Sequence, residues 1–199
     1  MRKRPKEKPD AALYEVKAQA LAMIEAQSRA GHIDLFYADE TRVSTEGYVP
    51  YGWQFAHEKL TIEVKRWGAL NVFGLLNRSN QLIYRTTVEN INADFVIEQL
   101  ESLSWKITRP TVVVLDNASA HKARKLAQCI DYWQQRGLFL FYLPPYSPHL
   151  NIIERFWKEL KEGCIRPEDY QSADTLFYAV DRALAATGKQ IKVNFANYQ

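Results

Sequence analysis

The chain has 199 residues, a length that accommodates one domain with one substantial core. Hydrophobic residues make up 47% and aromatic residues 13%, which excludes a disordered chain. No apolar run reaches ~18 residues, so no membrane span is expected. The net charge is +3, and residues 1–10 carry that whole excess with five basic and two acidic side chains. Composition alone therefore does not establish a nucleic-acid-binding face, and the basic tail can equally be a solvated linker.

The N-terminus carries charges where a signal peptide needs an apolar region, so we expect an intracellular protein. The two cysteines, Cys129 and Cys164, form no CxxC motif and are expected to be reduced. The four histidines form no short-range pair, so a zinc site is not expected. These histidines are His32, His57, His121 and His149.

The first half of the chain predicts a helix followed by strands. Residues 11–30 have apolar side chains at helical spacing, and Gly31 follows as a stop signal. Residues 33–39 predict a strand whose alternation places Ile33, Leu35, Tyr37 and Asp39 on one face. Residues 40–66 are interpreted as an irregular, β-rich excursion. Residues 69–76 and 81–88 predict a hairpin.

The second half alternates helices and buried strands. The predicted helices span residues 93–105, 119–136, 151–162 and 173–186, and the predicted strands span residues 111–115 and 138–143. Three prolines after the last strand exclude a helix there. Hairpin strands followed by strands that alternate with helices predict an α/β fold, a mixed sheet flanked by helices on both faces.

Two aspartates follow apolar runs in this arrangement. Asp39 ends the run LFYAD, and Asp116 ends the run VVVLD. Ligands of open α/β sheets bind at the carboxyl ends of the strands, so the two carboxylates converge if their strands are neighbours. Carboxylates suit Mg²⁺, and two such ions need a third acid. Each aspartate alone can also be a turn former or a helix cap.

Glu154 is the candidate third acid. It lies in the first turn of the helix predicted over 151–162, just outside its apolar arc and on the side of Lys158 and Lys161. Two structural roles compete with metal binding. Asn151 and Glu154 resemble a capping box, and Glu154 with Lys158 forms a stabilising i,i+4 pair.

Further polar residues near these acids are candidates for supporting roles. Asn117 can support the metal site or cap the next helix, and capping is favoured. His121 can contact a phosphate, orient a carboxylate or be purely structural, and His149 can face the substrate. Basic side chains that can contact DNA phosphates, or only form a solvated face, are Lys122, Arg124, Lys125, Arg155, Lys158 and Lys161.

The motifs DNASAH (116–121) and LPPYSPHLNIIERFWKELK (143–161), with YADET (37–41) upstream, resemble the catalytic domain of DDE transposases of the mariner superfamily, especially its bacterial insertion-sequence branch. The 76 residues between Asp39 and Asp116, and the 37 between Asp116 and Glu154, are similar to that family's intervals. The resemblance covers roughly residues 13–186.

The resemblance implies an RNase H-like fold with a five-stranded sheet, three strands antiparallel and the others parallel. It implies that Asp39, Asp116 and Glu154 are both catalytic and metal-binding, and that they hold Mg²⁺ or Mn²⁺, with two ions expected. It further implies DNA cleavage at transposon ends and transfer of a 3′-hydroxyl into target DNA, commonly at TA sites. In-line phosphoryl transfer positioned by metals agrees with this.

The domain organisation expected from the resemblance is a basic tail over 1–10 and an RNase H-like DDE catalytic domain over 11–199, without the family's N-terminal helix-turn-helix modules. DNA is the expected partner, together with a homodimer mate and a separate DNA-binding subunit or a missing N-terminal domain. The location that the resemblance implies is the bacterial cytoplasm, in association with the nucleoid. Relatives often have proline where Ile152 follows Asn151. Other RNase H-like nucleases such as resolvases, and an inactive or domesticated DNA- or partner-binding domain, remain alternatives.

Overall fold

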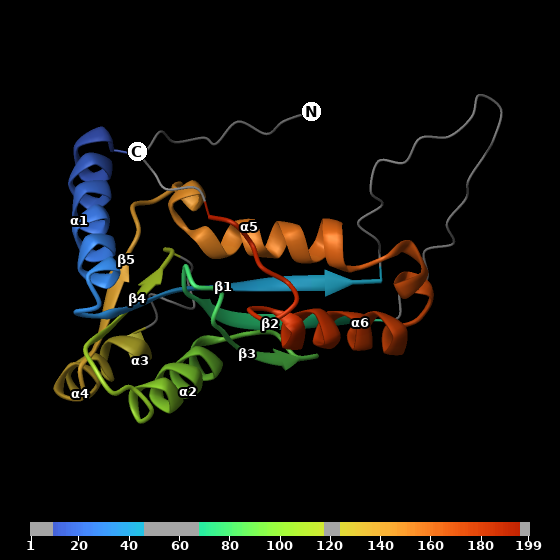
Figure 1. Cartoon of the computed structure of the whole chain (residues 1–199). Helices are drawn as coiled ribbons and strands as arrows, with labels where there is room; N and C mark the ends of the chain where they lie inside the picture. Colours follow the sequence, from blue (N-terminus) through green and yellow to red (C-terminus); the bar gives the residue numbers. More distant parts are fainter. Residues whose placement is uncertain (1–9, 46–67, 118–123, 196–199) are drawn as a thin grey trace.

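A computed structural model describes residues 10–45, 68–117 and 124–195, and its centre is one mixed sheet (Figure 1). The strands are ordered β3-β2-β1-β4-β5. Strands β1, β2 and β3 are antiparallel neighbours, while β4 and β5 run parallel to β1. Their bounds are β1 Asp34–Ser44, β2 Ala69–Leu76, β3 Leu82–Thr87, β4 Thr111–Leu115 and β5 Leu138–Tyr142. The predicted mixed five-stranded sheet is therefore confirmed.

The helices cover both faces of this sheet. Their bounds are α1 Ala11–Arg29, α2 Ala93–Ser104, α3 Arg124–Ala127, α4 Ile130–Gln135, α5 Ile152–Glu159 and α6 Ala173–Ala186. A π-helical turn continues α5 over Leu160–Cys164, and 3-10 turns occupy Pro148–Leu150 and Pro167–Gln171. Within the described ranges, no helix is both long and apolar enough to cross a membrane.

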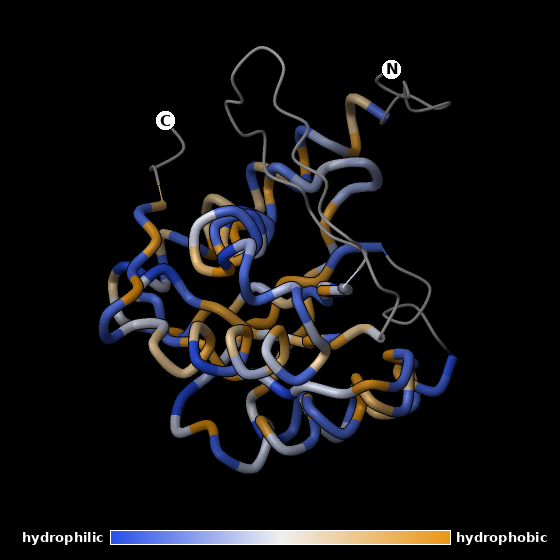
Figure 2. Tube along the Cα trace, turned by 90° about the vertical axis from the view of Figure 1, so that its right-hand side faces the viewer, coloured by the Kyte–Doolittle hydropathy of each residue, from blue (hydrophilic) through white to orange (hydrophobic). Residues whose placement is uncertain are grey.

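The alternation of side chains along β1 separates two hydrophobic cores. Leu35 and Tyr37 point to the face covered by α1, α5 and α6, which we call the α5 face. Phe36 and Ala38 point to the opposite face, covered by α2, α3 and α4, which we call the α2 face. Figure 2 shows the hydrophobic segments gathered at the sheet and polar segments outside. Any residue on β1 can therefore be assigned to one face by its parity.

Strand β1 is longer than the sequence predicted. It does not end at Asp39 but continues to Ser44, because its second half pairs with β2, from Glu40 opposite Phe73 to Ser44 opposite Ala69. Its parallel pairing with β4 ends at Tyr37. The start of the excursion predicted over 40–66 is therefore regular strand, and residues 46–67 lie outside the described part of the chain.

The helix predicted over residues 119–136 is interrupted in its described part. Two short helices, α3 and α4, replace it. The amides of Gln128 and Cys129 bond to the carbonyls three residues back, and the Cys129 thiol approaches the Lys125 carbonyl at 3.6 Å. These tighter bonds replace the i−4 pattern of a continuous helix and break it.

Strand β5 is also less buried than predicted. The sequence favoured a strand buried on both faces, but Phe139 is 40% exposed and Phe141 and Tyr142 are only partly buried. The reason is topological, because among the described residues β5 lies at the edge of the sheet and pairs with β4 alone. Apolar composition alone does not distinguish an edge strand from a central one.

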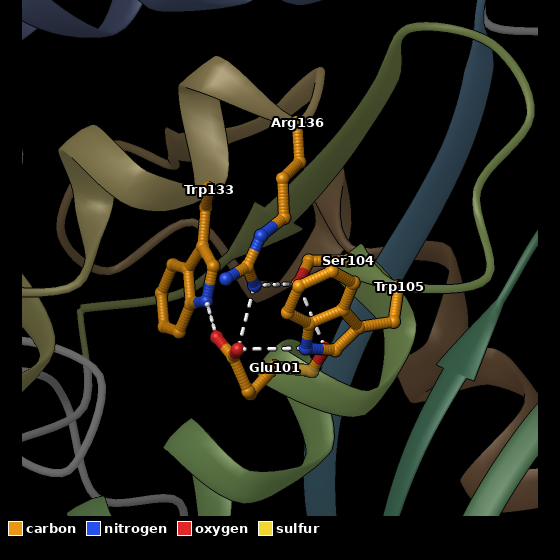
Figure 3. A network of polar contacts seen from close by, with 5 residues as sticks. All are labelled: Glu101, Ser104, Trp105, Trp133 and Arg136. Atoms are coloured by element: carbon orange, nitrogen blue, oxygen red, sulfur yellow. Dashed lines mark hydrogen bonds and ion pairs between the residues drawn. The ribbon is translucent and has the colours of Figure 1, made fainter.

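A polar network joins α2 to α4 on the α2 face (Figure 3). The Glu101 carboxylate accepts hydrogen bonds from Trp133 Nε1 at 2.7 Å and Trp105 Nε1 at 2.9 Å. Arg136 donates to it at 2.6 Å and also to the Ser104 hydroxyl. The Arg136 guanidinium lies 3.7 Å from the centre of the Trp105 ring. This carboxylate is therefore fully compensated by neighbouring donors.

Candidate active site

The two aspartates lie on neighbouring strands and at the same level of the sheet. Strands β1 and β4 pair in parallel with Tyr37 opposite Val114, so the register carried two residues further brings Asp39 opposite Asp116. Both acids share the parity of Tyr37 and Val114, whose side chains belong to the core of the α5 face. The condition that the sequence left open, that the two strands be neighbours, is met.

Helix α5 brings Glu154 to the same face. Its buried stripe packs into the core of the α5 face and includes Ile153, Phe156 and Trp157. Glu154 lies outside this stripe, as its helical angle predicted, and borders a cleft shared with Asp116. The helix therefore presents its acid to the ends of the sheet strands instead of to the core.

The three acids are close enough to repel one another. Burial raises the pKa of the Asp39 carboxyl to about 8, and the charges of Glu154, Glu40 and Asp116 add to this rise. Partial burial raises the pKa of Glu154, with Asp116 the largest charge that adds to the effect. Like charges disfavour ionisation in this way when no cation balances them. The site is thus a cluster of acids in which Asp39 is buried and Glu154 is exposed, and their simultaneous ionisation is disfavoured.

Two further residues, Glu40 and Lys161, belong to this electrostatic cluster. Glu40 follows Asp39 on a strand that continues to Ser44, so its side chain points to the opposite face, but its charge still acts on both Asp39 and Glu154, and its backbone amide donates to the Asp39 carboxylate. Lys161 is half-buried, which lowers its pKa, while Glu154 and Asp39 act in the opposite direction. The sequence predicted this placement, because Lys161 follows Glu154 by seven residues, two helical turns, on the same side of the helix.

The structural roles that competed for Glu154 are not observed. Asn151 begins α5 without a side-chain capping bond, so no capping box forms. Lys158 approaches Glu162, at 3.8 Å, instead of Glu154. The side chain of Asn151 bonds across to the sheet, where its Nδ2 donates to the Ala38 carbonyl at 3.1 Å.

The proline-rich connection after β5 forms the wall of a cleft of about 470 Å³ beside the acids. Asp116 and Glu154 line it, and Asn117 stands at its edge, where its amide donates to the Leu143 carbonyl. The remaining walls come from Leu143, Pro144, Pro145, Tyr146, Ser147, Pro148 and Asn151. The cleft opens directly on two of the three acids and can admit a ligand.

The supporting histidines are placed less favourably. The Nε2 atom of His149 bonds to the Tyr14 hydroxyl at 2.9 Å, which ties the connection to α1, and His149 does not line the cleft. His121, for which a phosphate contact or a structural role was left open, lies outside the described residues, as does the helix start that Asn117 was expected to cap. The side chain of Asn117 links the ends of β4 and β5, and its capping role stays a prediction.

The donor set fits a hard divalent cation. Carboxylate oxygens are the ligands that Mg²⁺ prefers, and a cation would relieve the repulsion that raises the pKa of Asp39. Among residues 10–45, 68–117 and 124–195, no three Asp, Glu, His or Cys side chains lie close enough together to hold a metal ion without further ligands. Sites of this class take further ligands from water and substrate phosphates.

Comparison with known proteins places the chain in a family and identifies its fold. Residues 34–177 match the family model described as DDE superfamily endonuclease. No curated protein matches the chain.

Among solved structures, a Mos1 transposase paired-end complex with left transposon end aligns with a TM-score of 0.62 and 17% identity over 94% of this chain. A Mos1 mariner paired end complex with Mn aligns with a TM-score of 0.59 and 17% identity, also over 94% of this chain. The catalytic core domain of BIV integrase aligns with a TM-score of 0.50 and 16% identity, and the alignment covers 80% of this chain and 86% of the integrase chain. The chain spans 58% of the length of these Mos1 chains. At such identities the likeness shows the fold, which is RNase H-like.

Proposed function

Because its family model matches residues 34–177, the chain belongs to the DDE superfamily of endonucleases, and we propose that it is a transposase catalytic domain. The proposed reaction is divalent-metal-dependent cleavage of DNA at transposon ends, followed by transfer of the freed 3′-hydroxyl into target DNA. The observation that carries this proposal is the convergence of Asp39, Asp116 and Glu154 on one face, close enough for their charges to raise the pKa of Asp39 to about 8.

In this proposal Asp39, Asp116 and Glu154 hold two Mg²⁺ or Mn²⁺ ions. Asp39 is the most central ligand, because it is 8% exposed and feels the charge of both other acids. When bound, the ions activate the attacking oxygen and stabilise the leaving oxygen of an in-line displacement. A Mos1 complex with Mn is among the similar structures, which supports the choice of cation.

The protein's own groups then bind and orient the DNA. Lys161 is held beside the acids and can contact a phosphate next to the scissile one. Lys158 and Arg155 are exposed on the same helix and can extend that contact along the backbone. The proline-rich wall is rigid, which holds Asn117 and the cleft in place while the strand is positioned.

The proposed partners follow from the reaction. DNA is the substrate, both as transposon end and as target. We propose a homodimer, in which two active sites serve the two transposon ends. The similar Mos1 structure, a paired-end complex, supports this proposal. Specific recognition of the ends is assigned to a separate DNA-binding module or subunit.

The test is cleavage of a supercoiled plasmid in Mn²⁺, which does not depend on recognition of a particular end. We expect Asp116→Asn to reduce nicking on the order of 10³-fold or more, because the loss of a metal-binding charge removes transition-state stabilisation. Asp131→Asn is the matched control, since Asp131 is exposed on α4 on the other face of the sheet. Full activity of Asp116→Asn would refute the site assignment.

A further inference from the structure

Asn151 forms a buried link between the two elements that carry acids. It is 3% exposed, and its Nδ2 donates to the carbonyl of Ala38, the residue immediately before Asp39. Its own carbonyl accepts the amide of Glu154 at 3.2 Å. One residue therefore contacts the backbone next to Asp39 through its side chain and the backbone of Glu154 through its main chain.

This bond replaces an easier local one. Asparagine at the start of a helix usually accepts a hydrogen bond from the first turn with its side chain. Asn151 makes no such bond, and its Oδ1 has no hydrogen-bond partner among the described residues although it is buried. A buried amide left half-satisfied costs stability. Helix capping therefore does not account for Asn151, whereas the link to β1 does.

Gly74 supplies the clearance that this link requires. It pairs directly with Asp39 across β1 and β2. A Cβ atom at Gly74 would lie 2.8 Å from Cη2 and 3.0 Å from Cζ2 of Trp157, and 3.3 Å from Cδ1 of Ile153. Only glycine lets α5 lie this close to the sheet at the level of Asp39, so the hydrogen bond and the clearance act at the same point.

We propose that Asn151 is a positioning residue that holds Glu154 against Asp39, with Gly74 providing the close approach of α5. The inference rests on the proposed function, because it assigns Asn151 to the geometry of the metal-binding acids. Asn151 itself contacts the backbone beside the acids and acts through Glu154.

The test is Mn²⁺ binding measured by calorimetry, together with thermal melting in EDTA. The variants are Asn151→Ala, Glu154→Gln and their combination. We expect each single variant to weaken Mn²⁺ binding by ~10-fold or more, the range found for residues that orient metal ligands. In the Glu154→Gln background, Asn151→Ala should add less than ~2-fold, because the residue through which it acts is already changed.

Asn71→Ala is the matched control. Asn71 is also buried, and its Nδ2 donates to the Glu89 carbonyl at 2.9 Å, so it makes the same kind of bond elsewhere on the sheet. We expect it to lower the melting temperature about as much as Asn151→Ala while leaving Mn²⁺ affinity unchanged. A merely structural Asn151 would behave like this control, and that result would overturn the inference while leaving the proposed function intact.

A second route avoids dependence on the stability of Asn151→Ala. Gly74→Ala should weaken Mn²⁺ binding by pushing Trp157 and α5 outward, and adding Trp157→Leu should restore part of it by removing the clashing ring atoms. Unchanged affinity in Gly74→Ala would also overturn the inference. Unchanged affinity in Glu154→Gln would overturn both the inference and the proposed metal site, as would absence of Mn²⁺ binding in the wild type when a DNA duplex is present to supply phosphate ligands.

Discussion

Two carboxylates on opposite faces of the sheet have opposite electrostatic environments. Glu101, on the α2 face, accepts hydrogen bonds from two indoles and Arg136, and these bonds lower its pKa (Figure 3). Asp39, on the α5 face, is buried beside other acids, and its pKa rises to about 8. The first acid is neutralised by partners within the chain, whereas the second is surrounded by groups of its own sign.

The difference separates a structural acid from a candidate catalytic one. The Glu101 network joins α2 to α4, so its contribution is to stability. The cluster around Asp39 costs stability in the absence of a cation, because its charges are confined together. A site that destabilises the free protein and is relieved by a ligand is the pattern expected where function, not folding, selects the residues.

The largest expected effect is a gain of stability when Asp39 is changed to Asn. The unfolded Asp39 ionises near 3.8 and the folded one near 8. Below about pH 4 both states are protonated, so the substitution changes little by this route. Between pH 4 and 8 only the unfolded state ionises, so the wild type loses stability as the pH rises. We expect Asp39→Asn to be more stable by roughly 2–4 kcal/mol at pH 8.5 in EDTA.

Urea denaturation of both proteins at pH 4.5 and pH 8.5 checks this. The advantage of the variant should be small at the lower pH and near its full size at the higher one. The Glu40 amide that donates to Asp39 can also donate to the asparagine oxygen, so the substitution removes charge without removing that bond. An advantage of equal size at both pH values would show that repulsion is not its source.

The sequence predicted most of the fold because its periodic patterns are strong. The strand over Thr111–Leu115 and the helix over Ala173–Ala186 were predicted with the bounds that the structure has. The failures occurred where tertiary context decides. Nothing in the residues around Asp39 shows that β1 continues to Ser44, since that extension depends on pairing with a strand some thirty residues later. Likewise, the edge position of β5 is a property of the sheet order.

The candidate site divides in a similar way. Once β1 and β4 are known to be neighbours, the alternation of side chains and the parallel register predict that Asp39 and Asp116 lie opposite each other on the same face of the sheet. The part played by Asn151 could not be foreseen, because its partner Ala38 is 113 residues away and local sequence favours a helix cap. Long-range hydrogen bonds of single side chains leave no periodic signal.

An intermediate effect is expected from Glu101→Gln. The amide oxygen can accept the two hydrogen bonds that Oε1 of Glu101 accepts, from Arg136 and Trp105, but it carries no charge for Arg136, and the NH₂ group then faces the Trp133 N–H donor. We expect the free energy of unfolding to fall by about 1–3 kcal/mol at pH 7. Since the pKa of Glu101 is lowered in the folded state, this contribution exists above about pH 4.5 and is lost as the pH falls further.

Glu98→Gln is the matched control for that substitution. Glu98 lies on the same helix and pairs with Arg85, but both side chains are largely exposed, so its loss should change stability by less than ~1 kcal/mol. Both variants should retain Mn²⁺ binding and plasmid nicking at the wild-type level. Loss of nicking in a folded Glu101→Gln protein would contradict the separation between the two carboxylates.

The smallest expected effects come from Trp105, which is 69% exposed and contributes one donor and one ring to the Glu101 network. Trp105→Phe keeps a ring beneath Arg136 and removes the hydrogen bond, and it should cost about 0.5–1 kcal/mol. Trp105→Leu removes both, and the additional loss of about 0.5–1 kcal/mol measures the cation–π contact. Urea denaturation of the two variants separates these contributions. If Trp105→Phe is as stable as the wild type, Trp133 and Arg136 alone compensate the charge of Glu101, and the role of Trp105 reduces to holding the guanidinium in place.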